Sequence, residues 1–249
     1  MTAEEKENKK SISAAEYIRT TFHSSDRLAV LVRNRSRGET IQRITTSARI
    51  VEPAFQEWMH FKNEKESCDI YVGMNTLKPE ARTRTKEDIQ TIRHLYVDID
   101  HDGPAALAKI QQSSLVPSPN YTVNTSPDKF QVVWRVENIS PEQAEALQRA
   151  MARKFGGDPA ATDSTRVLRL PGFLNRKYDT EFWVHAEKHT DRSVICTTSG
   201  SAPSLSKVIS GLATIHRRQL RPSRARSASP NMTGPMRSAP SPAVTTRKS

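Results

Sequence analysis

Two carboxylates close a short apolar strand pattern, His94-Leu-Tyr-Val-Asp-Ile-Asp100. Because side chains alternate between faces along a strand, Asp98 and Asp100 are predicted to point the same way. Adjacent carboxylates repel each other, and a divalent cation such as Mg²⁺ or Mn²⁺, which prefers oxygen ligands, relieves that repulsion. The pattern therefore indicates metal-dependent phosphoryl chemistry, although a solvated strand end carries the same short motif.

A second dense segment runs from Gly157 to Lys177. Its acids are Asp158 and Asp163, either of which could complete a two-metal site with the first pair. The cations later in the segment are Arg166, Arg169 and Lys177. They could neutralise a triphosphate, with the arginines making bidentate contacts. Salt bridges that only stabilise a turn are the alternative reading of this segment.

The net charge of +11 over 249 residues is unevenly distributed. Residues 201–249 contain nine Lys or Arg and no acid, which leaves 29 basic and 27 acidic residues in 1–200. A basic surface indicates a polyanionic partner. Here that argument applies chiefly to residues 201–249.

The remaining composition narrows the class of protein. No apolar run approaches the roughly 20 residues that cross a membrane, and the polar N-terminus does not look like a secretory signal, so we expect a cytoplasmic protein with no membrane contact. Cys68 and Cys196 are isolated, which favours neither a disulfide framework nor a zinc site.

The elements that must position these side chains follow from apolar periodicity and capping signals. Strands are predicted at 28–32, 40–44, 69–74, 94–100, 121–124, 130–136 and 181–189. Helices are predicted at 13–22, 52–61, 104–112 and 140–156, and residues 78–92 as a loop with a short helix. In the helix at 52–61, Phe55, Trp58 and Phe61 are expected to pack in the core.

This order of elements defines the expected organisation. Single helices among strands, with one hairpin at 121–136, indicate an α+β (mixed α/β) fold. We expect a flexible N-terminus at 1–12, one globular domain at 13–200, a short helix within 201–220 and a disordered Ser/Pro/Arg-rich tail at 221–249.

Three blocks of the chain together resemble the archaeo-eukaryotic primase superfamily, and in particular the RepB-like primase domains of plasmids and mobile elements. They are Leu95–Asp100, the hairpin Thr125-Ser-Pro-Asp-Lys-Phe-Gln-Val-Val-Trp134, and Asp158–Lys177. The stretch Tyr71–Asn75 is also similar to these domains. The resemblance spans about residues 25–190 and implies an RRM-like sheet, which carries the acids, beside an N-terminal α/β unit.

The resemblance also implies roles for individual residues. Asp98, Asp100 and Asp158 would be catalytic metal ligands, because an acid eight and eleven residues before two arginines matches the family's third motif; Asp163 is the alternative third carboxylate. The residues that would bind the incoming nucleotide are Ser126, Lys129, Gln131, Arg166, Arg169 and Lys177. Gln131 stands where many superfamily members carry histidine, and glutamine can hydrogen-bond a phosphate but cannot carry charge.

The implied function is a DNA primase or primase-polymerase that makes short primers on single-stranded DNA from NTPs or dNTPs. It would use two Mg²⁺ or Mn²⁺ ions and serve plasmid or mobile-element replication, with a replicative helicase as a candidate partner. Two other classes stay open: a non-catalytic single-strand-binding relative and a metal-dependent nuclease. The Arg/Lys cluster favours the polymerase, because a nuclease needs no triphosphate pocket.

Overall fold

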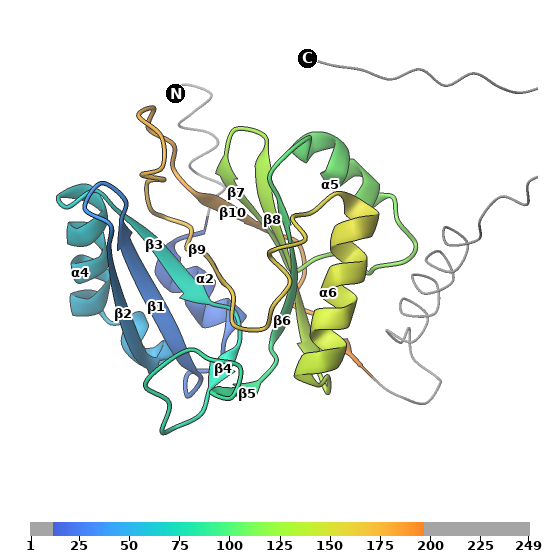
Figure 1. Ribbon diagram of the computed structural model, residues 1–249, viewed down its shortest axis with the longest axis horizontal. Coiled ribbons are helices and arrows are strands. Elements are labelled where there is room, and N and C mark those ends of the chain that lie inside the picture. Colours follow the sequence, from blue (N-terminus) through green and yellow to red (C-terminus); the bar gives the residue numbers. More distant parts are fainter. Residues whose placement is uncertain (1–11, 197–249) are drawn as a thin grey trace, which may run out of the picture.

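The computed structural model describes residues 12–196 as two sheets that face each other, with α2 (Ala14–Thr21) between them and the longer helices on their outer sides (Figure 1). The N-terminal sheet has the strand order β2-β1-β3-β9, and the second, acid-bearing sheet has the order β10-β7-β8 with β6 and β11 also paired to β8. The predicted mixed α/β fold is thus confirmed. The tail and the helix predicted within 201–220 lie outside the described residues.

The N-terminal sheet is antiparallel throughout. Its strands are β1 (Arg27–Asn34), β2 (Glu39–Thr46), β3 (Cys68–Gly73) and β9 (Val167–Arg169). Residues Leu28, Val30 and Val32 of β1 face a core that includes α2 (Ala14–Thr21) and α4 (Pro53–Glu64). Alternation therefore leaves Leu31 and Arg33 on the opposite face of the sheet.

The acid-bearing sheet is built around the predicted hairpin, β7 (Tyr121–Ser126) and β8 (Lys129–Glu137). β6 (His94–Ile99) pairs antiparallel with β8, β10 (His185–Lys188) pairs with β7, and β11 (Val194–Ile195) runs parallel to the end of β8. The outer face packs on α5 (Gly103–Gln111) and α6 (Pro141–Phe155) through an apolar cluster. α6 begins with the capping box of Ser140 and Gln143 and ends at Gly156, whose φ is 77°.

Three local expectations are wrong. Phe61 is 54% exposed, because the buried stripe of α4 runs through Phe55, Met59 and Asn63 at i, i+4, i+8 spacing and excludes it. Residues 78–92 form no helix; the short strands β4 (Thr76–Leu77) and β5 (Ile89–Thr91) pair there instead. The strand expected from residue 181 starts at His185, since Trp183 bridges back to Leu174 in a tight excursion.

One short helix, α3 (Ser47–Ile50), joins β2 to α4. Among the described residues, no helix has the length and apolar character that spanning a bilayer requires.

Candidate active site

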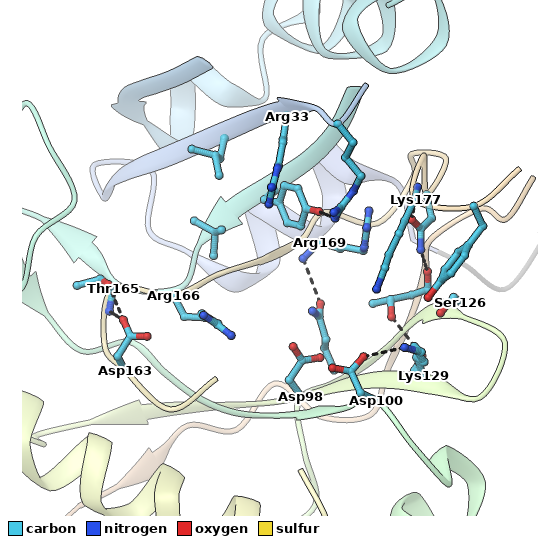
Figure 2. A pocket seen from close by; sticks show the side chains of 18 of the residues that line it. Arg33, Asp98, Asp100, Ser126, Lys129, Asp163, Thr165, Arg166, Arg169 and Lys177 are labelled. Carbon is cyan, nitrogen blue, oxygen red and sulfur yellow. Dashed lines mark hydrogen bonds and ion pairs between the residues drawn. The ribbon is translucent and has the colours of Figure 1, made fainter. Parts of the chain in front are cut away.

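An open pocket of about 480 Å³ lies between the facing surfaces of the two sheets. The acid-bearing sheet contributes Asp98 and Gln131, and the N-terminal sheet contributes Arg33, Tyr71 and Arg169. Figure 2 shows the aspartates on one wall and Arg33 and Arg169 on the other. The pocket therefore sets two acids opposite a basic wall.

The predicted pair of acids occupies this pocket. Asp98 is the fifth residue of β6, and Asp100 follows directly after that strand, so both side chains line the cavity as the alternation predicts. Burial, followed by the charge of Asp100, raises the pKa of Asp98 to about 6. A bound cation would remove that electrostatic cost.

Gln131 links the two sheets at this point. It lies opposite Asp98 in the β6–β8 register, and its amide hydrogen-bonds to Asp98, which partly offsets the rise in the carboxyl pKa. Its Oε1 accepts a hydrogen bond from the backbone N–H of Arg169 at 3.1 Å. Both ends of this amide are therefore engaged, and it orients Asp98 relative to β9.

The two candidates for the third carboxylate differ in position. The backbone N–H of Asp158 donates to the carbonyl of Asp98 at 2.7 Å, and the charge of Asp158 also raises the pKa of Asp98. Gly157 permits this approach, because a Cβ there would lie 2.5 Å from Val97. Asp158 does not line the pocket, however, and its Oδ2 lies 3.8 Å from Arg166.

Asp163 does line the pocket, but its carboxylate is engaged locally. Its Oδ1 accepts hydrogen bonds from the backbone N–H and the hydroxyl of Thr165, the former at 3.0 Å. The hydroxyl of Tyr96 donates to the carbonyl of Asp163. Figure 2 places Asp163 and Thr165 together at one end of the pocket, away from Asp100.

The donor set fits a hard divalent cation through Asp98 and Asp100, whose carboxylate oxygens suit Mg²⁺ or Mn²⁺. Within residues 12–196, no group of three or more His, Cys, Asp or Glu side chains is gathered closely enough to hold a metal ion. The third ligand therefore remains a prediction, for which Asp158 and Asp163 compete.

Lys129, Ser126 and Lys177 line the other end of the pocket. Lys129 Nζ lies 3.1 Å from Asp100 Oδ1, and Lys177 Nζ lies 5.4 Å from the centre of the Tyr178 ring. Burial raises the pKa of the Tyr178 hydroxyl, but the two lysine charges outweigh burial and hold it below its usual value. This end of the pocket is thus electropositive.

Arg166 and Arg169 both line the pocket, yet only one is neutralised by a close partner. Arg169 Nη1 lies 2.6 Å from Oδ1 of Asp69, which is fully buried. Among the described residues, Arg166 forms one loose ion pair, at 3.8 Å, with Asp158. Arg166 is consequently the more available of the two for an external anion.

Asp69 organises the basic wall, although no motif in the sequence marks it. Its oxygens accept from Arg35 Nε at 2.7 Å, from the Arg169 guanidinium and from the backbone N–H of Arg176 at 2.8 Å. Burial alone would raise its pKa, but the hydrogen bonds from Arg169 and Arg35 hold that pKa below the usual range. A lone acid inside an otherwise apolar strand was the available signal.

For several other pocket residues the sequence predicts no role in the site: Arg33, Arg35, Tyr71, Arg84, Asn175 and Tyr178. Arg33 and Tyr71 project from β1 and β3 on the face opposite the core, which alternation within those strands could have revealed. Arg84 and Asn175 lie in loops, where periodicity carries no information.

Comparison with known proteins identifies the family. Residues 36–199 match the model of the RepB DNA-primase N-terminal domain. A replication protein from Clostridium perfringens is 28% identical over an alignment of 156 residues, which covers 54% of this chain and 37% of that protein. The chain thus spans little more than a third of the length of this relative.

Solved structures show the same fold. The catalytic domain of primase RepB′ in complex with initiator DNA superposes with a TM-score of 0.55 at 22% identity, covering 84% of this chain and 100% of that chain. The AEP domain of the cyanophage S-2L primase-polymerase has a TM-score of 0.53 at 14% identity, covering 76% and 89% respectively. Since the family model matches more than half of the residues, the chain belongs to the RepB DNA-primase N-terminal domain family.

Proposed function

We propose that this domain synthesises short primers on single-stranded DNA by metal-dependent nucleotidyl transfer during plasmid or mobile-element replication. The family match supports a primase-like role in replication. The observation that carries the finer proposal is the pocket itself, in which Asp98 and Asp100 face a wall of arginines and lysines. A nucleotide needs both, acids for metal-assisted chemistry at the α-phosphorus and cations for the phosphates.

In the proposed reaction the 3′-hydroxyl of one nucleotide attacks the α-phosphorus of the next. The hydroxyl gives up its proton to solvent as its oxygen forms a P–O bond, the bond between the α-phosphorus and the leaving oxygen breaks, and pyrophosphate departs. Mg²⁺ or Mn²⁺ held by Asp98 and Asp100, with Asp158 as the proposed third ligand, would stabilise the charge that develops on the attacking and leaving oxygens.

The protein's own residues would bind and orient the phosphates. Arg166 and Lys177 are the best placed, because neither is held by a close carboxylate within the described part of the chain. Lys129 would divide its charge between Asp100 and a phosphate. Ser126 would donate its hydroxyl, while Gln131 and Arg169 would fix the spacing between acids and cations through the hydrogen bond that joins them.

The template is proposed to be single-stranded DNA, which accords with the initiator DNA in the related RepB′ structure. Binding would rest on phosphate contacts and weaken with added salt.

The deciding experiment is primer synthesis from labelled NTPs or dNTPs on a single-stranded template, with Mg²⁺ or Mn²⁺. Labelled products longer than one nucleotide are expected. Template binding without synthesis would instead indicate a non-catalytic binding protein, and template degradation would indicate a nuclease.

A further inference from the structure

Arg84 lies in the loop between β4 and β5, and this loop is held in a defined shape. Oδ2 of Asp88 accepts hydrogen bonds from Thr83 Oγ1 and from the backbone N–H of Thr85 at 3.0 Å. The residues on both sides of Arg84 are thus tied to a single carboxylate. The loop presents Arg84 in a fixed position rather than leaving it to sample solvent.

The Arg84 side chain reaches the pocket but finds no partner there. Its Nε is buried and without a hydrogen bond, and no carboxylate of residues 12–196 forms an ion pair with it. Burial lowers the pKa of this guanidinium; the charge of Asp163 opposes that shift and the charge of Arg166 adds to it. Arg84 is thus a half-buried cation that lies near both the Asp163 carboxylate and a second cation, Arg166.

Two neighbouring arginines of the pocket differ from Arg84 in having a carboxylate partner. Arg35 and Arg169 both bond to the buried Asp69, so their charges are neutralised within the protein. A half-buried guanidinium without such a partner costs free energy, because its Nε has given up water and gained no hydrogen bond in return. Such a group is retained where a ligand supplies the missing anion.

A second set of contacts fixes the distance between Arg84 and Arg166. On α6, Oε2 of Glu145 lies 2.8 Å from Lys86 Nζ, two residues beyond Arg84. Oε1 of the same carboxylate accepts from the backbone N–H and the hydroxyl of Ser164, both at 3.0 Å, two residues before Arg166. One glutamate therefore ties together the two loops that carry the arginines.

We propose that Arg84 is a phosphate-binding residue that acts together with Arg166. This inference rests on the proposed function, under which the ligand is the triphosphate of the incoming nucleotide. The two guanidinium groups would bind the part of the phosphate chain at the end of the pocket that contains Asp163, which leaves Lys129 and Lys177 to contact the part at the other end. A phosphate there would supply both the hydrogen bond and the charge that Arg84 lacks.

The test is calorimetric titration of the full chain with inorganic triphosphate and with ATP, in metal-free buffer so that catalysis does not enter. The variant is Arg84→Gln, and the matched control is Arg82→Gln, which removes an exposed arginine of the same loop outside the pocket. A hydrogen bond to a charged group corresponds to roughly a tenfold change in affinity or more. We expect that loss of affinity for both ligands in Arg84→Gln, and near wild-type affinity in Arg82→Gln.

The melting temperature of the free protein separates a binding role from a structural one. Because Arg84 has no ion pair within residues 12–196 to lose, Arg84→Gln should melt no lower than wild type. A lower melting temperature with unchanged affinity would overturn the inference, and so would wild-type protein that binds neither triphosphate nor ATP. Wild-type protein that binds both but makes no primers would refute the proposed function and leave the assignment of Arg84 standing.

Discussion

Asp69 and Arg169 form an ion pair at 2.6 Å, with side-chain exposures of 0% and 8%. The pair joins β3 to β9 within the N-terminal sheet, and the backbone N–H of Arg169 continues to Gln131 in the facing sheet. One buried carboxylate thereby sets the position of the basic wall relative to the acids.

Asp69→Asn is predicted to lower the free energy of unfolding by about 3 kcal/mol or more, because it leaves its arginine partners without their counter-charge. Urea unfolding measures the loss. The control is Asp191→Asn, which removes the exposed carboxylate of the ion pair with Lys188 and should leave stability nearly unchanged. Equal stability of both variants would contradict the role assigned to Asp69.

Asp98→Asn and Asp100→Asn are each predicted to reduce primer synthesis to background while the fold is retained. Loss of even the outer partners of metal ligands costs roughly 10- to 100-fold, so loss of a ligand should cost at least as much. In metal-free buffer Asp98→Asn should raise the melting temperature, since it removes a desolvated charge beside Asp100. Near wild-type synthesis by either variant would show that the acid pair does not hold the metal.

Asp158→Asn is predicted to be as damaging to synthesis as those two changes, and Asp163→Asn milder. The backbone N–H of Asp158 hydrogen-bonds to the carbonyl of Asp98, and the charge of Asp158 raises the pKa of the Asp98 carboxyl. The Asp163 carboxylate, in contrast, accepts a hydrogen bond from Thr165. Synthesis rates for both variants, measured in one assay over a range of Mn²⁺ concentrations, give the ranking. The reverse ranking would assign the third ligand to Asp163.

His94 is predicted to make stability fall as the pH drops below about 6.5. Burial lowers the pKa of its imidazole to about 4, and its Nδ1 contacts the carbonyl of Met74 at 2.7 Å while Nε2 is buried without a partner. Between the unfolded value near 6.5 and the folded value, only the unfolded chain binds a proton, so acid favours unfolding. The loss between pH 6.5 and 5 should be about 2 kcal/mol.

The effect of His94 on stability must be measured in a variant that lacks the Asp98 carboxylate. The raised pKa of Asp98 means that the folded chain takes up a proton below about pH 6, which stabilises it and opposes the effect of His94. Urea unfolding of Asp98→Asn at several pH values isolates the histidine. Adding His94→Gln should flatten the slope, and an unchanged slope in the double variant would refute the assignment.

The sequence predicts those parts of the fold that local pattern determines. The hairpin of β7 and β8, the capping box of α6 and the shared face of Asp98 and Asp100 all follow from alternation or capping. The pairing of β9 with β3 is different, because three residues carry no readable period and their partner lies about a hundred positions away. Arg35 and Arg84 could likewise not be placed in the pocket from sequence alone, because they lie in loops.

The pairing of β9 with β3 also bears on when the pocket is completed during synthesis of the chain. The first three strands of the N-terminal sheet leave the ribosome early, but the edge of β3 stays unpaired until Val167–Arg169 emerge. Arg166 and Arg169 arrive with that last strand, so a nascent or truncated chain has neither a closed sheet edge nor a complete basic wall. Until then the open edge is exposed to association with other chains, and the pocket is completed only when nearly the whole domain has been made.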